Sequence, residues 1–208
     1  MKTHKPTLCT TTEEISQMLI GGVEELIGRD DLQELLKRED IPFELDLNQA
    51  IRLTGGLSFA EIKRMEGCLE DRFGENGSRG AALHTGRSFF QDFFQKYGVD
   101  SGLNSLDFRM QPLKKRIMSG LETLSVLLSD STSMDIKIRD DDQKWYWVLE
   151  NGNWCRDING GGVPLCDFSI GLLQAYLSWA SGGKAYPIQK NQEVGSLCVI
   201  EIGKKAIG

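Results

Sequence analysis

The sequence predicts an α+β fold in which an antiparallel sheet is packed against helices. Three observations carry this prediction. Apolar residues recur at helical spacing through about the first 130 residues, and residues 134–139 and 144–150 then alternate as strands do. An apolar helix over residues 166–181 follows. Two further strands are expected after it, near residues 184–189 and 197–202.

The composition is that of an acidic globular protein, with 24 Lys and Arg against 30 Asp and Glu in 208 residues. A net charge of −6 argues against a general nucleic-acid binder, which needs a basic surface. The first six residues are polar, and no run approaches the roughly 18 apolar residues of a membrane span. We therefore expect a cytoplasmic protein without a transmembrane segment.

Residues 1–11 are expected to form a flexible lead-in to one domain over residues 12–208. This domain would have a helical half over about 12–130 and a hairpin–helix–hairpin half over about 134–203. Gly28 is a natural stop for the first helix, and Ser58 with Glu61 forms a capping box for a helix that ends at Gly74. Between these helices we expect a helix over 32–37, a loop over 39–46 and a short helix or turn over 47–56.

Two features of these helices are interpreted as packing. Gly21 and Gly22 each lower helix propensity by about 1 kcal/mol, so we interpret the pair as a close approach of a neighbouring element. Cys68 falls on the apolar side of its helix and is expected to be an inert core thiol.

The helix expected over residues 79–97 is the most aromatic part of the chain. Its aromatic residues lie on adjacent stripes at i, i+3 and i+4, which plain core packing or a dimer interface would also use. We interpret the helix as one wall of an apolar ligand cavity, with His84 as a ligand anchor or metal ligand and Arg87 as a partner for a ligand carboxylate. A satisfied or exposed histidine and an ordinary salt bridge to Asp or Glu are the favoured alternatives for these two residues. The predicted ligand-binding residues on this helix are His84, Arg87, Phe89, Phe90, Phe93, Phe94 and Tyr97.

The second half begins with a helix from Pro112 to about Leu128 and continues into a hairpin. Three consecutive aspartates, Asp140 to Asp142, form the expected hairpin turn and lack the spacing of a calcium loop. On the returning strand Trp145 and Trp147 share one face, and both are predicted to contact the ligand. The apolar helix that follows should end at Gly182 and Gly183.

The five cysteines are Cys9, Cys68, Cys155, Cys166 and Cys198. An odd number at wide spacing is not typical of a secreted disulfide framework. In the expected reducing compartment they should be thiols or metal ligands.

The motifs of the second half, taken in order, resemble a 4-vinyl reductase domain. They are Trp145-Tyr146-Trp147, Asn153-Trp154-Cys155-Arg156, Pro164-Leu165-Cys166, Gly171-Leu172-Leu173, Ser181-Gly182-Gly183-Lys184, Gly195 and Cys198. Upstream, Glu24 to Gly28, Phe73-Gly74, Gly80 and His84-Thr85-Gly86-Arg87 resemble the helical half of the same hydrocarbon-binding proteins. The resemblance covers about residues 12–203.

This resemblance implies an α+β fold shared with vesicle-tethering TRAPP subunits and haem-based nitric oxide sensors. It also implies a small-molecule-binding domain that forms a homodimer. Relatives are linked to bacteriochlorophyll synthesis, to regulators that sense aromatic compounds and to cyanobacterial photosystem assembly. A tetrapyrrole or another apolar molecule is therefore the expected ligand. Protein partners in photosystem assembly and a place at the periphery of photosynthetic membranes are the further expectations.

The sequence departs from the family at its zinc site. The resemblance implies two cysteine ligands at Cys166 and Cys198, but Gln189 and Gln192 stand near the remaining positions, and glutamine is a poor zinc ligand. Even with Cys155 as a third ligand the set is incomplete. We expect no bound zinc and interpret Cys155, Cys166 and Cys198 as relict positions.

Three functions are compatible with the sequence. The first is a non-enzymatic binding domain for an apolar ligand, with a bilin thioether at Cys155 or Cys166 as a variant. The second is a scaffolding or assembly protein with a vestigial pocket. The third is a tetrapyrrole vinyl reductase, which is disfavoured because no dinucleotide fingerprint or iron–sulfur cysteine cluster is present. We expect the first.

Overall fold

A computed structural model describes residues 12–132, 134–150, 164–192 and 198–207. The chain divides into two compact units, which are described separately. Among the described residues, the helical unit comprises 12–89 and 164–173, and the sheet unit comprises 90–132, 134–150, 174–192 and 198–207. The prediction of a single domain stays a prediction.

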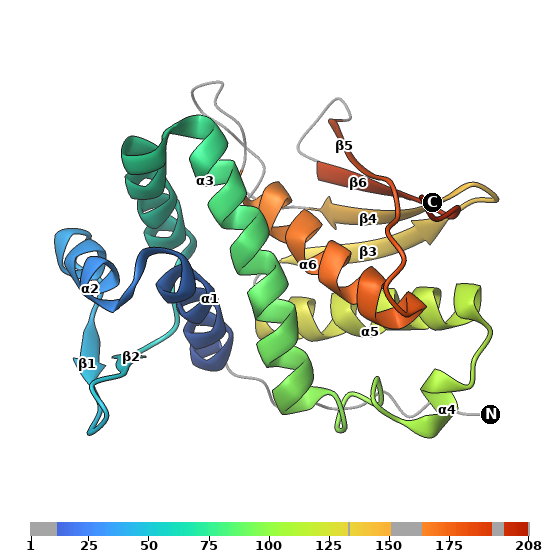
Figure 1. Ribbon diagram of the computed structural model, residues 1–208, viewed down its shortest axis with the longest axis horizontal. Coiled ribbons are helices and arrows are strands. Elements are labelled where there is room, and N and C mark those ends of the chain that lie inside the picture. The colour runs from blue at the N-terminus through green and yellow to red at the C-terminus, as the bar shows by residue number, and fades with distance from the viewer. Residues whose placement is uncertain (1–11, 133, 151–163, 193–197, 208) are drawn as a thin grey trace. The chain divides into compact units, whose positions relative to one another are not determined.

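The helical unit contains three helical segments and a small hairpin before the start of a fourth helix (Figure 1). The elements are α1 (Thr12–Ile27), α2 (Arg29–Arg38), β1 (Phe43–Leu45), β2 (Ile51–Leu53), the first part of α3 (Phe59–Tyr97) and the start of α6 (Pro164–Ser181). The predicted stop at Gly28 is confirmed, since this residue has φ 83° and separates α1 from α2. A positive φ of this kind is one that glycine adopts without steric cost.

The hairpin corrects the sequence analysis, which expected a loop over 39–46 and a short helix or turn over 47–56. Instead β1 and β2 pair antiparallel, with Glu44 opposite Arg52. The backbone N–H groups of Asn48 and Ala50 donate to the Asp46 carboxylate at 2.8 and 2.9 Å, which fixes the turn. Three-residue strands are too short to give a clear alternating pattern, so the prediction missed them.

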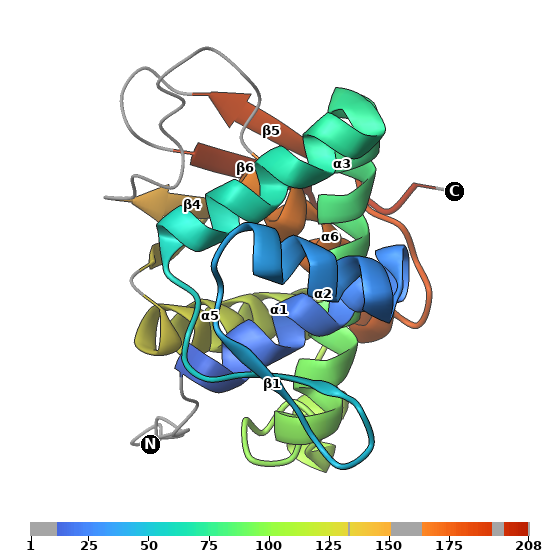
Figure 2. The ribbon, with the colours of Figure 1, turned by 90° about the vertical axis from the view of Figure 1, so that its left-hand side faces the viewer.

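A side chain of α1 holds the hairpin in place. The Gln17 amide nitrogen donates to the Ile51 carbonyl at 2.8 Å, and the Leu53 N–H donates to the Gln17 amide oxygen at 3.1 Å. One amide therefore satisfies two backbone groups on β2, as buried backbone groups require. Figure 2 shows the hairpin beside α1 and α2.

Helix α3 confirms the predicted capping box. The Ser58 N–H donates to the Glu61 carboxylate at 2.6 Å, and the Glu61 N–H donates to the Ser58 hydroxyl at 3.3 Å. The label α3 covers two helical limbs that meet at Gly74, where φ 71° and ψ 173° are not helical. The predicted end of the first limb at Gly74 is therefore confirmed.

Glycines allow the helices of this unit to approach closely. A Cβ at Gly22 of α1 would lie 3.0 Å from the Thr85 Cα on α3, which confirms the packing interpretation for Gly22. Where α3 meets α6 the approach is closer, because a Cβ at Gly86 would lie 2.0 Å from the Phe168 carbonyl oxygen.

The sheet unit contains four antiparallel strands in the order β3-β4-β6-β5. Figure 1 shows these strands with α5, which lies against β3. This arrangement confirms the predicted α+β fold with an antiparallel sheet and helices packed on it. The elements, besides the ends of α3 and α6, are α4 (Leu106–Arg109), α5 (Leu113–Ser131), β3 (Asp135–Asp140), β4 (Lys144–Glu150), β5 (Ile188–Gln192) and β6 (Cys198–Gly203).

The predicted hairpin around the three aspartates is confirmed. The Asp141 carboxylate accepts hydrogen bonds from the N–H groups of Gln143 and Lys144, each at 2.7 Å, and so closes the turn. The stop after α6 is also confirmed, since Gly182 and Gly183 have φ values of 74° and 96°.

Tyr176 joins α6 to α5 inside the sheet unit. Its hydroxyl is buried and donates to the carbonyl of Ile117 at 2.8 Å. The same hydroxyl also lies within hydrogen-bond distance of the Arg116 carbonyl, at 3.1 Å. Gly120 leaves room for the ring, since a Cβ there would lie 1.9 Å from the hydroxyl oxygen.

Replacing this tyrosine with phenylalanine tests the contribution of the hydroxyl. We expect Tyr176→Phe to lower the free energy of unfolding by about 1 kcal/mol, because two carbonyls lose their donor while the ring stays packed. Urea denaturation at constant pH measures the loss. A variant as stable as the wild type would show that the hydroxyl contributes nothing net.

Candidate functional site

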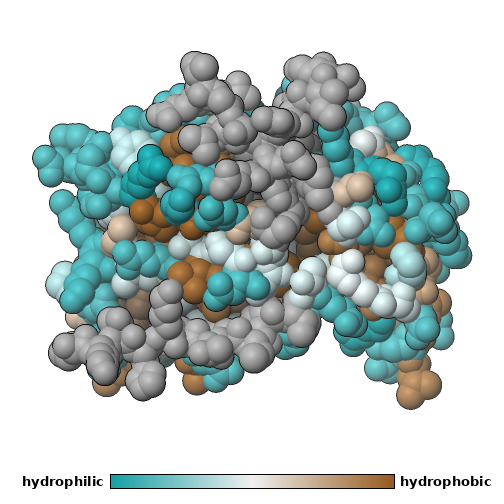
Figure 3. All heavy atoms as spheres, turned by 180° about the vertical axis from the view of Figure 1, so that it is seen from behind, coloured by the Kyte–Doolittle hydropathy of each residue, from teal (hydrophilic) through white to brown (hydrophobic). Residues whose placement is uncertain are grey.

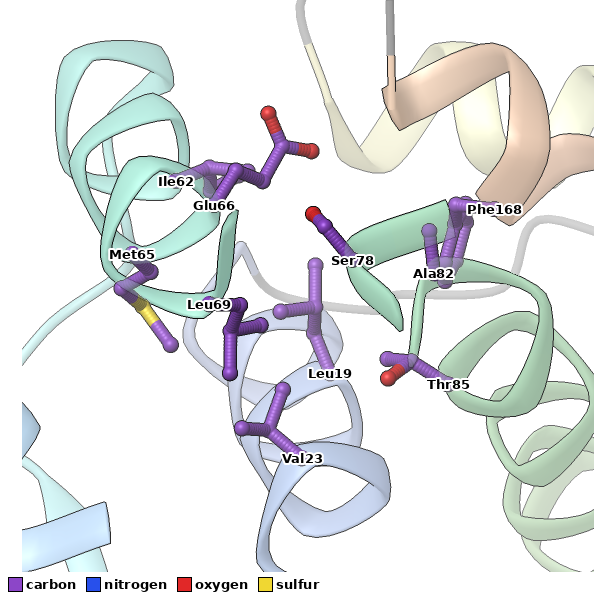
Figure 4. Close-up of a pocket in the computed structure, with 10 residues that line it drawn as sticks. All are labelled: Leu19, Val23, Ile62, Met65, Glu66, Leu69, Ser78, Ala82, Thr85 and Phe168. Carbon is purple, nitrogen blue, oxygen red and sulfur yellow. The ribbon is translucent and has the colours of Figure 1, made fainter. Parts of the chain in front are cut away.

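A small cavity lies in the angle between the two limbs of α3 (Figure 4). We call it the elbow cavity. Its volume is about 40 Å³, which is room for about three water molecules. It is lined by Leu19 and Val23 of α1, by Ile62, Met65, Glu66 and Leu69 before the kink, by Ser78, Ala82 and Thr85 after it, and by Phe168 of α6.

The polar groups of the elbow cavity are one carboxyl and two hydroxyls. In Figure 4 the Glu66 carboxyl group and the Ser78 hydroxyl point toward each other from the two limbs of α3. Ser78 and Thr85 are both buried, at 5% and 6% exposure. The other lining side chains are apolar, as in most small-molecule sites.

Glu66 is the unusual residue of this cavity. Among the residues that the structure describes, no donor forms a hydrogen bond or ion pair with its carboxyl group. Burial raises the pKa of Glu66 from 4.5 to about 8; the positive charge of Lys63 opposes the shift and the negative charge of Asp167 adds to it. The carboxyl group is therefore largely protonated at neutral pH.

A second cavity, of about 410 Å³, lies on the α2 side of α3 and includes Cys68 in its lining. The Cys68 thiol donates to the Glu39 carboxylate at 2.8 Å and also contacts the Arg38 guanidinium. Burial and the bond to Glu39 raise the pKa of this thiol. Cys68 is buried as expected and stays protonated, so its nucleophilicity is low.

The two polar residues predicted to contact a ligand both lie on α3 in the helical unit. The His84 Nε2 lies 3.2 Å from the Glu25 carboxylate of α1, and the His84 side chain is 40% exposed. Arg87 is exposed. Neither lines the elbow cavity or the second cavity, and their role in ligand binding stays a prediction.

The aromatic residues predicted on α3 pack against other aromatic side chains. In the helical unit, Phe89 meets Phe168 edge-on at 5.4 Å between ring centroids. In the sheet unit the rings of Phe90, Phe93, Phe94 and Tyr97 come next along α3. Phe94 lies 4.4 Å from Trp179 and Phe90 lies 5.8 Å from Tyr176, while Phe93 and Tyr97 pack together at 5.4 Å. These contacts are those of a core, and the predicted ligand contacts remain untested.

Trp145 and Trp147 lie on β4 and are 2% and 1% exposed. The indole N–H of Trp147 is buried and has no hydrogen-bond acceptor within the described part of the chain. A buried indole N–H usually has an acceptor, so this donor is an exception within the sheet unit. The predicted ligand contacts of both tryptophans stay predictions.

The prediction that the cysteines are thiols or metal ligands is wrong for two of them. Cys166 and Cys198 are both disulfide-bonded, and sulfur in a disulfide is no thiolate for a metal. Both are buried, at 0% and 2% exposure. Cys155 lies outside the described residues, as does Cys9. Across the described ranges, no group of three or more metal-ligating side chains is found.

Glu66 was not among the predicted site residues, although its position in the sequence pattern is unusual. Ile62, Met65 and Leu69 form the apolar stripe of the first limb of α3, and Glu66 stands one turn after Ile62 on the same face. A charged residue within an apolar stripe must be paired, protonated or functional. The apolar stripe does not predict the angle at Gly74, which places Ser78 opposite Glu66.

The elements define an α+β fold with a four-stranded antiparallel sheet in the sheet unit and a small, mostly apolar cavity in the helical unit. No family model matches the chain, and no curated protein matches its sequence. Within the described helices, none is long and apolar enough to cross a membrane.

Solved structures similar to this chain include H-NOX domains. A structure on heme distortion in the H-NOX family has a TM-score of 0.62 and 12% identity, with 95% of this chain and 97% of that chain covered. An Fe(II) unliganded H-NOX protein mutant from K. algicida has a TM-score of 0.60 and 11% identity, with 94% and 97% covered. An oxygen-binding H-NOX domain related to soluble guanylate cyclases has a TM-score of 0.59 and 12% identity, with 94% and 96% covered. The expected fold shared with haem-based nitric oxide sensors is confirmed.

Proposed function

We propose that this chain is a non-enzymatic domain that binds a small apolar molecule, and that the elbow cavity is the centre of its binding site. The observation that carries the proposal is the cavity itself, where seven apolar side chains surround one carboxyl group without a protein partner among the described residues. Such a site offers apolar contact area and one polar group that orients a ligand. The solved domains of this fold bind heme or oxygen, according to their descriptions, which supports a binding role.

The described histidine, the two disulfide-bonded cysteines and Tyr176 do not offer an axial ligand for a haem iron. Haem iron takes an axial ligand such as histidine, thiolate, methionine or tyrosine. His84, the described histidine, is half-exposed and paired with Glu25, while Cys166 and Cys198 are disulfide-bonded. The Tyr176 hydroxyl is held by backbone carbonyls, and burial raises its pKa further above the ordinary value. No step through haem iron is therefore proposed.

The ligand class we propose is a metal-free tetrapyrrole pigment or a pigment precursor, with a role in pigment metabolism or photosystem assembly. The support is the sequence resemblance to 4-vinyl reductase domains, together with the heme, itself a tetrapyrrole, that descriptions of the H-NOX structures name. A tetrapyrrole is larger than the elbow cavity, whose volume is about 40 Å³. Its binding would require the two limbs of α3 to open at Gly74, the residue with non-helical angles between them.

Ligand titration with a cavity-filling variant tests this function. Biliverdin and a divinyl chlorophyll precursor are titrated into the protein and followed by absorbance, and native mass spectrometry gives the stoichiometry. We expect one ligand per chain and at least tenfold weaker binding in Ala82→Phe, because the added ring fills the cavity. The control is Gln91→Phe at an exposed position of α3, which should bind as the wild type does.

The outcomes separate the general function from the ligand class. If neither pigment binds but native mass spectrometry finds another apolar molecule that Ala82→Phe excludes, the pigment proposal is wrong and the binding function stands. If no apolar molecule binds, or if Ala82→Phe binds as well as Gln91→Phe, the elbow cavity is not the binding site.

A further inference from the structure

Glu66 of the elbow cavity has no counter-ion among the residues the structure describes, and no hydrogen bond to its carboxyl group is found there either. Its side chain is half-buried, and Leu19, Val23 and Leu69 form part of the cavity wall. Keeping a carboxylate in such surroundings is costly unless a cation is supplied.

The charged groups near Glu66 do not pair with its carboxyl group. Asp167 on α6 acts on Glu66 electrostatically, but its carboxylate pairs with Arg79 at 3.2 Å. Lys63, one turn earlier on the same limb of α3, is exposed and acts on Glu66 only through its field. The contribution of α1 to the lining is Leu19 and Val23, which carry no charge. A cation that enters the cavity would therefore find Glu66 as its nearest unpaired carboxyl group.

We infer that the elbow cavity binds the head of a primary ammonium ion, with Glu66 as its counter-ion and the Ser78 hydroxyl as a further acceptor. This inference rests on the proposed function, since it assigns ligand chemistry to the same cavity. An ammonium group has three N–H donors, and the Glu66 carboxylate and the Ser78 hydroxyl, which point toward each other in Figure 4, can accept two of them. The volume, about 40 Å³, admits the ammonium group with a few carbon atoms, and the rest of a longer ligand would extend through the mouth.

The pH dependence of binding follows from the protonation state of Glu66. Below about pH 8 the carboxyl group holds a proton, which an ammonium ion must displace. Affinity for an ammonium ion should therefore rise about tenfold for each pH unit up to the pKa and level off above it. A neutral ligand that accepts a hydrogen bond from the protonated carboxyl group would show the opposite trend.

The test uses propylamine, which stays protonated between pH 6 and 9 because alkylamines ionise near the lysine value of about 10.4. Binding is measured by amide chemical-shift titration of the full chain at each pH unit, with propan-1-ol as the neutral probe of the same size. We expect propylammonium affinity to rise about fiftyfold from pH 6 to pH 8, because the ionised fraction of Glu66 rises from about 1% to about one half. Propan-1-ol should bind weakly and without pH dependence.

Two variants assign the effect to Glu66. Glu66→Gln should abolish the pH dependence and weaken propylammonium binding at pH 8 at least tenfold. Glu70→Gln removes an exposed carboxylate one turn further along α3 and should bind propylammonium as the wild type does. Thermal melts of both variants check that they are folded.

Three results would overturn the inference: propylammonium binding that does not change with pH, binding that weakens as the pH rises, or binding that Glu66→Gln leaves intact. If these occur while an apolar ligand still binds and Ala82→Phe still excludes it, only the ammonium assignment fails. If no apolar ligand binds either, the proposed function fails with it.

Discussion

Substituting Gly86 with alanine is expected to lower the free energy of unfolding by about 3 kcal/mol, because α3 and α6 have no space between them at this point. The added Cβ would lie 2.0 Å from the Phe168 carbonyl oxygen and 2.8 Å from the Leu172 nitrogen. Both atoms belong to the backbone of α6, so no rotamer change can relieve the overlap. Chemical denaturation of Gly86→Ala measures the loss.

The facing glycine and an exposed glycine provide the controls. A Cβ at Gly171 of α6 would lie 2.1 Å from the Leu83 carbonyl oxygen, so Gly171→Ala should cost a similar amount. Gly80 lies on α3 with no atom within 4 Å of its added Cβ. Gly80→Ala should therefore stabilise the chain by up to about 1 kcal/mol, through helix propensity alone. Equal effects at Gly86 and Gly80 would contradict the close crossing of α3 and α6.

Glu66→Gln is expected to stabilise the chain by about 3 kcal/mol at pH 8 and to change the pH dependence of its stability. The pKa of Glu66 is about 8 in the fold, against 4.5 for an ordinary glutamate. The stability that protonation of Glu66 contributes is fully present below about pH 4.5 and is lost as the pH rises through 8. In that window the wild-type free energy of unfolding should fall with rising pH, by up to about 1.4 kcal/mol per unit.

Comparison with the variant isolates the contribution of Glu66. Glutamine has the same shape but does not titrate, so the difference between Glu66→Gln and the wild type should grow from pH 5 to pH 8. Glu70→Gln is the matched control, and its difference from the wild type should stay small across the same range. A constant difference for Glu66→Gln would mean that Glu66 titrates normally and faces water.

Much of the fold could be predicted from local motifs. The capping box at Ser58, the stop at Gly28 and the turn at Asp141 each act within a few residues, so the sequence pattern is sufficient to locate them. The alternating strand Lys144–Glu150 has the bounds that the sequence predicts. The order of these elements was enough to predict an α+β class.

The candidate site could be predicted only in part, because it depends on contacts between distant segments. The elbow cavity combines side chains of α1, both limbs of α3 and α6, and it lies in the angle between the limbs that meet at Gly74. The sequence pattern located the helix end at Gly74 but not the angle between the limbs, which brings Ser78 toward Glu66. The β1–β2 hairpin was also missed, because it depends on hydrogen bonds to a distant residue, Gln17 of α1. Its turn carries the fully exposed Leu47. Figure 3 shows hydrophobic atoms that project from the molecule at the lower right.

The central claim is that Glu66, which has no partner among the described residues, is the polar group of the proposed binding site in the elbow cavity. Its pKa can be measured directly by ¹³C NMR titration of the side-chain carboxyl carbon, with and without propylammonium, using Glu66→Gln to assign the signal. We predict a pKa near 8 for the free protein. With saturating propylammonium we predict a decrease of at least about one unit, because a bound cation stabilises the carboxylate. A pKa near 4.5 that propylammonium does not change would contradict the account.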